Sequence, residues 1–367
     1  IGTGYDISDA TDYGLNYMQV DNDRLLEDEM ITAKLDFARP VEWGIIDAMS
    51  FGGRWTDREK DNDVVSWQQS VANSSANVDA FTYELGEGYD VPALYSVRNW
   101  SEVAQEAFGG IDNRNQHTQT NADILNSWNV QETNTALYVQ FNLLGEIGGI
   151  SYTGNVGVRY ISTESTSSGF QQADGGELTA VSIDHDYSEV LPALNLRFDI
   201  TEDSQIRFGL SRAISRPPLI EMRTGLQLNT SSTVNTASGG NPQLNPFIAD
   251  QVDLGYEYFF AEDAALTVSL FFKDLKSHVG AATDTLNING ESYQFTGPVN
   301  GDGGQIRGVE VMYQQAFNML PEPFDGLGIY TNYSYTDTNV TEFEPENNPL
   351  TMGGLSKNVG GLTLWTY

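Results

Sequence analysis

The chain has 367 residues, of which 40% are hydrophobic and 19% charged, and its 51 Asp and Glu against 18 Lys and Arg give a formal net charge of -33. So few basic residues argue against nucleic-acid binding, because phosphate contacts need clustered Lys and Arg. The absence of cysteine excludes disulfides, thiolate metal sites and a cysteine nucleophile.

Alternation of apolar and polar residues predicts long, two-faced β-strands along the whole chain. In residues 135–143, Leu137, Val139 and Phe141 fall on one face while Tyr138 and Gln140 fall on the other. Strands of nine to twelve residues suit a tilted crossing of a bilayer. The sequence contains no run of about 18 apolar residues, the length that a helix needs to cross. Similar apolar faces mark about twelve strands in all: Tyr13, Leu15, Tyr17; Ile31, Ala33, Leu35, Phe37; Ile45, Met49, Phe51, Trp55; the strand near 134–144; Val156, Val158, Tyr160; Leu194, Leu196, Phe198; Ile206, Phe208, Leu210; Val252, Leu254, Tyr256, Tyr258, Phe260; Leu266, Val268, Leu270, Phe272; Val309, Val311, Tyr313; Leu327, Ile329, Tyr333, Tyr335; Leu362, Leu364.

The opposite faces of these strands carry charged and amide side chains. Such a face suits a wet or plugged barrel lumen, although in a soluble sandwich it would be the outer surface. The residues expected to face the lumen or a plug include Arg159, Arg197, Arg207, Glu257 and Glu310. Alternation alone therefore does not decide between the two architectures.

Connection lengths favour the barrel. Short connections near 39–44, 145–149, 199–203, 261–264 and 318–326 alternate with long ones near 59–129, 164–181, 213–248, 278–303 and 340–353. An up-and-down barrel places every second connection on one rim, and outer-membrane barrels have short periplasmic turns and long extracellular loops. The sequence therefore predicts an all-β, transmembrane, up-and-down antiparallel β-barrel wall.

The connection at 59–129 is far longer than usual and is expected to be functional. It carries many aromatic residues among amides and carboxylates, a combination that binds sugars because rings stack on pyranose faces and polar groups take the hydroxyls. The alternative is that these rings form a small core of the loop itself, and a short helix is expected at 101–108. The candidate ligand-binding residues are Trp67, Tyr83, Tyr89, Tyr95, Trp100 and Trp128.

No catalytic or metal-binding signature accompanies these strands. His117, His185 and His278 are far apart in the sequence, and the acidic clusters at 61–63 and 184–186 lack calcium-loop spacing. No nucleophile elbow, phosphate loop or dinucleotide fingerprint occurs. We therefore expect no enzyme activity, no cofactor and no specific metal site.

Three motifs in hairpin order resemble the TonB-dependent outer-membrane receptors. A strand ends at an Arg-Pro step, Arg216-Pro217; the segment Gly240-Asn241-Pro242-Gln243-Leu244-Asn245-Pro246 follows; and Gly304 to Glu310 is similar to a Gly-x-x-x-Gly-x-Glu strand opening that includes Gly308. Residues 154–160 and 187–195 are similar to a proteobacterial subgroup often linked to carbohydrate uptake. The motif residues are Arg216, Pro217, Asn241, Pro242, Pro246 and Gly308.

Each motif also has a structural explanation. Pro217 and Pro218 would end strand pairing, residues 242–246 would make a stiff turn, and Gly308 would allow close backbone approach. We expect Arg216, Glu221 and Glu310 to support the fold or contact a plug rather than bind ligand directly.

The resemblance implies that residues 1–367 form the C-terminal part of a barrel of roughly 22 strands around a plug. The plug and the TonB box of such receptors have no counterpart in this sequence. The implied function is TonB-energised uptake of a scarce bulky solute in a Gram-negative outer membrane. The implied partners are the TonB-ExbB-ExbD complex through the plug, outer-membrane lipid and lipopolysaccharide, and an extracellular solute such as an oligosaccharide.

Alternatives to carbohydrate uptake remain open. A ferric-siderophore receptor belongs to the same family, although the few Arg and Lys at 59–129 disfavour an anionic iron complex. A passive porin, or a secreted soluble glycan-binding or glycan-cleaving β-protein, would belong to a different class.

Overall fold

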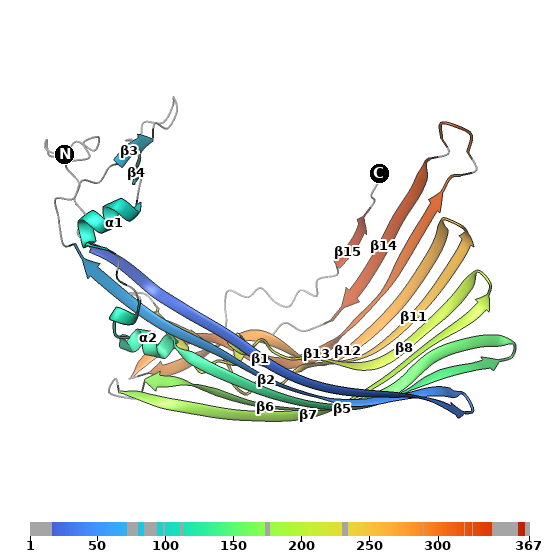
Figure 1. Ribbon diagram of the computed structural model, residues 1–367, viewed down its shortest axis with the longest axis horizontal. Helices are drawn as coiled ribbons and strands as arrows, with labels where there is room; N and C mark the ends of the chain where they lie inside the picture. The colour runs from blue at the N-terminus through green and yellow to red at the C-terminus, as the bar shows by residue number, and fades with distance from the viewer. Residues whose placement is uncertain are drawn as a thin grey trace. The chain divides into compact units, whose positions relative to one another are not determined.

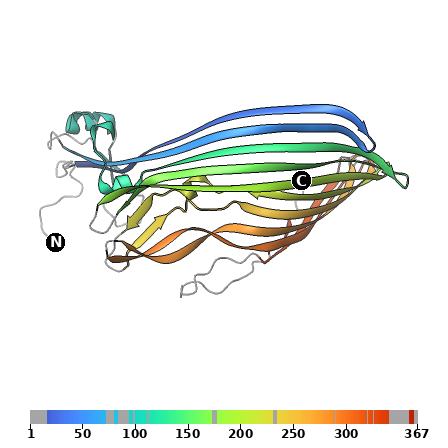
Figure 2. The same ribbon diagram turned by 90° about the horizontal axis from the view of Figure 1, so that it is seen from below.

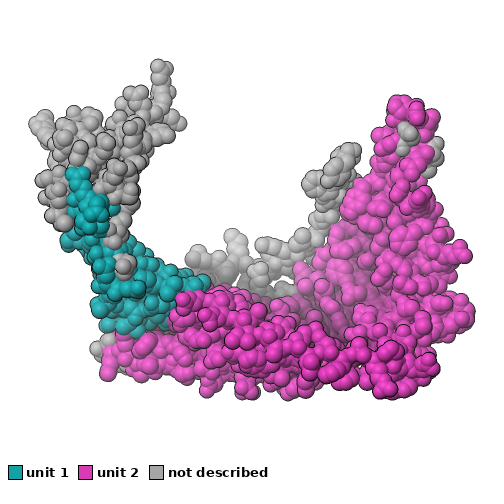
Figure 3. Space-filling view, in the orientation of Figure 1, with its two compact units in different colours: residues 1–26, 62–127 teal, residues 27–61, 128–367 magenta. Residues whose placement is uncertain are grey.

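The computed structural model describes residues 17–71, 80–83, 94–97, 100–110, 112, 114–172, 177–229, 234–288, 290–318, 320–324, 326–339 and 359–363. The chain divides into two compact units (Figure 3). Unit 1 comprises residues 1–26 and 62–127, and unit 2 comprises residues 27–61 and 128–367.

The dominant element is a 13-stranded sheet whose long strands follow one another in chain order as antiparallel neighbours. Strands β5 to β13 of unit 2 lie side by side in both ribbon views (Figures 1 and 2). The predicted up-and-down order is confirmed. The strands in this order are β1 (Tyr17–Trp43), β2 (Ile46–Ser70), β5 (Trp128–Ile147), β6 (Ile150–Gln172), β7 (Leu178–Thr201), β8 (Ser204–Ser215), β11 (Phe247–Ala261), β12 (Ala264–Ile288), β13 (Glu291–Ala316), β14 (Gly328–Thr338) and β15 (Val359–Thr363).

One face of this sheet is apolar and exposed, as alternation predicted. The side chains of Ile31, Leu35 and Leu137 are 67%, 63% and 59% exposed, and the Phe37 and Phe51 rings stack with centroids 5.2 Å apart. Exposed apolar surface repeated over many strands is what a lipid-facing barrel wall presents.

The opposite face is polar, and the strand registers bring its side chains into one surface. Arg197 lies opposite Arg207 between β7 and β8, and Arg207 lies opposite Gly255 between β8 and β11. The face continues through Glu257, which lies opposite Thr267, to Glu310, which lies opposite Ser269. Arg159 lies on the same face, opposite Leu191 of β7.

Several strands extend well beyond their predicted ends. Residues expected to form long connections at 164–181 and 278–303 instead continue the hairpins β6–β7 and β12–β13. Residues 165–168 of β6 are Ser and Thr on both faces, and glycines and polar residues interrupt the apolar residues of β12 and β13, so hydrophobic alternation does not detect these extensions. Across β12 and β13, for example, the Oγ1 atoms of Thr283 and Thr296 lie 3.1 Å apart. The strand expected at 13–17 is not separate either, since β1 runs without interruption from Tyr17; Tyr13, Leu15 and Leu364 lie outside the described residues.

The turns that join the two strands of each hairpin are short where the sequence predicted short connections. Ile147 pairs with Ile150, so only Gly148 and Gly149 connect β5 to β6. Both have positive φ, 60° and 85°, which suits the tight hairpin turns that match strand twist. Gly44, with φ 66°, plays the same part after β1.

Two segments depart from the simple hairpin pattern. Unit 1 contains β3 (Ala80–Tyr83), β4 (Leu94–Val97), α1 (Trp100–Phe108), η2 (Arg114–Gln116) and α2 (Asn121–Asn126), and α1 confirms the predicted short helix. In unit 2, η3 (Leu219–Met222), β9 (Leu226–Asn229) and β10 (Thr236–Gly239) lie between β8 and β11. Strand β10 pairs in parallel with β13. Within the described residues, no helix has the length and apolarity needed to cross a membrane.

Candidate functional site

The segment from Arg216 to Pro246, called the motif segment here, packs against the polar face of the sheet. Leu219, Met222 and Leu244 of this segment form a buried cluster with Trp128 and Val130 of β5. Met222 is 1% exposed and Leu244 is fully buried. Burying each such side chain stabilises the packed arrangement by about 1.5–3 kcal/mol, so the cluster anchors the segment to the wall.

Backbone hydrogen bonds fix the second half of the motif segment. The Asn241 N–H donates to the Glu221 carbonyl at 2.7 Å, and its side-chain amide donates to the Pro298 carbonyl at 3.2 Å. The Asn245 N–H donates to Asn300 Oδ1 at 2.8 Å, and Asn300 Nδ2 donates back to the Asn245 carbonyl at 2.9 Å. These contacts tie the segment to strand β13.

A buried polar cluster lies where the motif segment begins. Asn134 Nδ2 donates to Glu132 Oε1 at 2.7 Å, and Thr163 Oγ1 donates to Asn134 Oδ1 at 2.6 Å. Arg216 joins both strand residues: its NH1 donates to Asn134 Oδ1 at 2.9 Å and its Nε lies 3.3 Å from Glu132 Oε1. Glu132 is only 5% exposed, so Asn134 and Arg216 take the place of water around its Oε1.

A cavity of about 540 Å³ opens beside this cluster, a size within the range of ligand sites. Its walls come from β1, β2, β5, β6, β7, β8 and the start of the motif segment, all within unit 2. Four guanidinium groups line it, from Arg54, Arg58, Arg159 and Arg216, together with the carboxylate of Glu132. Apolar surface is provided by Ile161, Leu191, Pro217, Pro218 and Leu219, among others.

The guanidinium groups differ in how far they are neutralised. Arg58 forms a bidentate pair with Asp28 at 2.8 and 2.7 Å. Among the described residues, neither Arg54 nor Arg159 has an ion pair: Arg54 donates to Thr56 Oγ1 at 3.1 Å, and Arg159 lies over the Tyr138 ring, 5.4 Å from its centroid. The cavity is therefore electropositive within a strongly acidic chain.

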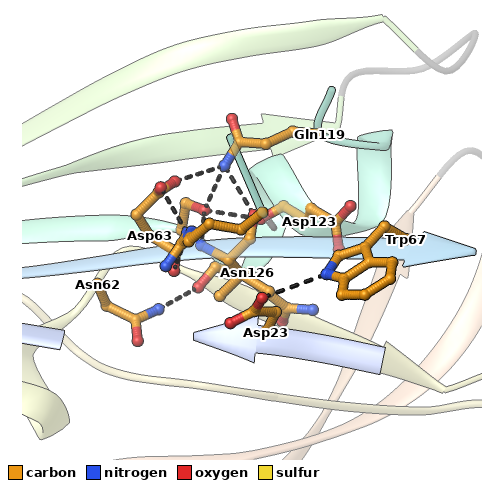
Figure 4. Close-up of polar contacts among 10 residues, drawn as sticks. Asp23, Asn62, Asp63, Trp67, Gln119, Asp123 and Asn126 are labelled. Atoms are coloured by element: carbon orange, nitrogen blue, oxygen red, sulfur yellow. Dashed lines mark hydrogen bonds and ion pairs between the residues drawn. The ribbon is translucent and has the colours of Figure 1, made fainter. Parts of the chain in front are cut away.

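Unit 1 holds a separate polar network at the end of β2 (Figure 4). Asp63 accepts from Arg114 NH2 and from Gln119 Nε2, both at 2.7 Å. Ser66 Oγ donates to Asp123 Oδ1 at 2.6 Å, and the Asn62 amide donates to the Asn126 carbonyl at 2.9 Å. The network fastens α2 and the preceding loop to the strand.

The chain matches a known family over nearly its whole length. Residues 2–367 match the family model "TonB dependent receptor-like, beta-barrel". This chain belongs to that family. TonB-dependent receptors are transport receptors of the Gram-negative outer membrane that bind extracellular solutes and interact with TonB, and the predicted fold class, part of an outer-membrane β-barrel, is confirmed.

Solved structures also resemble the chain at low identity. They include the siderophore receptor PiuA from Acinetobacter baumannii (14% identity, 92% of this chain and 41% of that one, TM-score 0.48) and the ferric-catecholate import receptor Fiu from E. coli K12 (14%, 86% and 38%, 0.44). A mutant ferric enterobactin receptor, PfeA, from Pseudomonas aeruginosa is a third (12%, 84% and 43%, 0.38). The chain spans less than half the length of each. No curated protein matches it.

The aromatic residues predicted to bind ligand in this TonB-dependent receptor fall into three groups. Tyr89 lies outside the described residues, and Tyr83, Tyr95 and Trp100 are placed only by backbone, in β3, β4 and α1. Trp67 is 8% exposed, and its ring stacks on that of His117 with centroids 5.0 Å apart. Its Nε1 donates to Asp23 Oδ2 at 3.2 Å. Trp128 is 6% exposed within the anchoring cluster. Both described rings therefore pack inside the protein, and ligand contact by the set stays a prediction.

The polar residues predicted for the lumen form local ion pairs on the sheet. Arg207 Nε lies 2.8 Å from Glu257 Oε1, and Arg197 Nε lies 3.1 Å from Asp199 Oδ1. Arg197 and Arg207 also line a second cavity of about 370 Å³. Whether a plug contacts them stays a prediction, as it does for Glu310.

Sequence reasoning missed the partnership between Glu132 and Arg216. Arg216 was expected to support the fold, and its bonds to Glu132 and Asn134 are of that kind, but it also lines the cavity. Glu132 precedes the strand predicted near 134–144, and its one usable signal was that it continues the register of that strand's lumen-facing residues. Among the motif residues, Gly308 lies where a Cβ would meet Phe271 Cζ and the Tyr335 carbonyl, each at 2.4 Å.

Proposed function

We propose that this chain forms the ligand-facing wall of a receptor that imports a scarce, bulky oligosaccharide across the outer membrane. Uptake would be energised by the TonB-ExbB-ExbD complex acting through a plug. Membership of the TonB-dependent receptor family supports the transport class. The sugar assignment goes further and rests on the chemistry of the cavity.

The observation that carries this proposal is the 540 Å³ cavity at the polar cluster. It combines hydrogen-bond donors on arginines, an acceptor on Glu132 and apolar surface on the Pro217-Pro218 step. Oligosaccharides present hydroxyl groups and apolar ring faces together, so a site with both kinds of surface suits them. The aromatic residues predicted at 59–129 stay a separate prediction of stacking platforms for sugar rings.

The location of the cavity also supports solute capture from outside. On β5 the outward-facing residues change from Leu137, which is 59% exposed and apolar, to the polar Thr133 and Gln131. Glu132 and Asn134 lie on the other face at this same level. If the short turns face the periplasm, the cavity lies near the extracellular boundary of the bilayer, where an incoming solute would first meet the wall.

A ferric siderophore is the second candidate solute. The observation that favours it is the excess of guanidinium groups lining the cavity, because many iron complexes are anionic. Residues 59–129 carry few Arg and Lys, which disfavours an anionic iron complex, whereas the positive charge of the cavity favours one.

The deciding experiment compares induction and uptake. The abundance of the receptor in detergent-extracted outer membranes should rise on one of a panel of glycans, and uptake of that glycan should fail in a strain lacking TonB. Induction by iron starvation alone would favour the siderophore. Uptake that continues without TonB would indicate a passive pore, and absence from the membrane fraction would contradict the barrel assignment.

A further inference from the structure

We propose that the arginine-lined cavity binds the carboxylate of an acidic oligosaccharide, a chain that contains uronic acid residues. This inference rests on the proposed function and narrows its substrate class. It draws on the charge of the cavity and on one unpaired buried acceptor.

The charge of the cavity selects for an anion. Four guanidinium groups face one carboxylate in its lining, although the chain as a whole carries a net charge of -33. Arg54 and Arg159 have no ion pair among the described residues, and both side chains are exposed. Guanidinium groups donate in a planar fork that matches a carboxylate, so unpaired arginines in a concave site are suited to bind one.

Glu132 favours a ligand that also carries a hydrogen-bond donor. Its Oε1 is engaged by Asn134 and Arg216, whereas its Oε2 is buried and has no hydrogen-bond partner among the described residues. A buried carboxylate oxygen without a donor is destabilising, because it has lost its hydrogen bonds to water and gained none. A ligand that approaches Glu132 is therefore favoured if it brings a hydroxyl donor.

These two requirements are met together by a uronic acid residue. Its ring carries a carboxylate for the guanidinium groups and hydroxyls that can donate to Glu132. An iron complex wrapped in catecholate or carboxylate oxygens presents acceptors to Glu132 and leaves its Oε2 unpaired. A neutral sugar can donate to Glu132 but forms no ion pair with Arg54 or Arg159. The chemistry of the cavity thus favours the acidic sugar over both.

The test is equilibrium binding to the full receptor purified in detergent. The probes are tetrasaccharides of galacturonic, mannuronic and guluronic acid, each paired with its carboxyl-reduced counterpart of the same linkage and length. We expect at least one tetrauronate to bind, and its carboxyl-reduced form to bind at least about 10-fold more weakly, as loss of a charge-assisted hydrogen bond implies. Affinity for the acidic form should also fall as salt rises.

Three variants locate the effect. Arg159→Gln and Arg54→Gln should each weaken tetrauronate binding about 10-fold while leaving the carboxyl-reduced form unaffected. Arg307→Gln serves as the matched control: its side chain is 69% exposed and paired with Asp337 away from the cavity. That control should bind like the unaltered receptor. All three variants should keep the heat-modifiable mobility in gels that marks a folded barrel.

Several outcomes would overturn the inference. Equal affinity for acidic and carboxyl-reduced sugars would show that the site does not recognise the sugar carboxylate. Unchanged tetrauronate affinity in both arginine variants would show that the sugar binds outside this cavity. If neutral oligosaccharides alone bind and are imported, the proposed function stands and the acidic substrate class fails. If only a ferric tris-catecholate binds, both fail.

Discussion

Two non-hairpin regions of this receptor, in unit 1 and in the motif segment, bury their apolar residues in different ways. In unit 1, Ala104, Ala107 and Phe108 of α1 form a small core with Met18 of β1 and with Val71. The motif segment instead packs its apolar residues on strand β5, in the cluster around Met222. A long connection can thus pack around a helix or lie along the sheet, and composition alone does not separate the two.

The two regions also differ in what fastens them. In unit 1, charged and ring contacts predominate: Asp63 with Arg114, and Trp67 stacked on His117. In the second half of the motif segment, the contacts are neutral amide and backbone hydrogen bonds, such as those of Asn241 and Asn245. The regions should therefore respond to different perturbations, and each can be loosened without the other.

The largest effect is expected for Trp67→Ala. Removing a buried indole costs about 3–5 kcal/mol, here because the stack on His117 and the 3.2 Å bond to Asp23 are both lost. Amide hydrogen exchange should accelerate across residues 114–127 while residues 219–246 keep their protection.

Trp43→Ala is the matched control for that experiment. Trp43 is 57% exposed, so its loss should leave exchange in residues 114–127 as in the unaltered protein. If Trp67→Ala also loosened the motif segment, the independence of the two regions would be wrong.

A smaller effect is expected for Gly240→Ala in the motif segment. A Cβ there would lie 2.5 Å from the Arg223 carbonyl oxygen and 2.6 Å from that of Glu221, and both are backbone atoms that cannot move aside cheaply. We expect a cost of about 1–3 kcal/mol and faster exchange at residues 219–246. Gly326→Ala, where a Cβ would meet nothing within 4 Å, should change nothing measurable; equal behaviour of the two variants would show that Gly240 is not tightly packed.

The wall was predictable from sequence because its signal is local. Leu137, Val139 and Phe141 alternate with polar residues, and the outer-membrane strand pattern follows from that. Helix α1 was likewise found from a short local pattern. The hairpin extension at 164–172 was missed because residues 165–168 are Ser and Thr on both faces, and the one at 278–288 because Gly280, Thr283 and Asp284 interrupt its apolar residues.

The candidate site was much less predictable, because it depends on contacts between distant residues. Arg216 was recognised as a motif residue, but its partner Glu132 lies on a strand far earlier in the chain. No periodicity links the two, and only the fold shows that they share a cavity with Arg54 and Arg159. The aromatic residues were identified by type alone, and type does not tell a ring that packs inside, as Trp67 does, from one that meets a ligand.

The smallest effect separates the two regions by pH. Burial acts to raise the pKa of the Asp123 carboxyl, but hydrogen bonds from Ser66 and Thr120 outweigh it, so the pKa lies below its usual value. A carboxyl whose folded pKa is depressed stabilises the fold above its unfolded pKa of about 3.9, and this contribution is lost as pH falls through the folded value. Exchange protection of residues 120–127, corrected for intrinsic rates, should therefore decline below about pH 4, and Asp123→Asn should be less protected at neutral pH and lose that decline. Residues 240–246, held by neutral groups, should show a flat profile over the same range; a parallel decline there would mean that both regions share one titrating support.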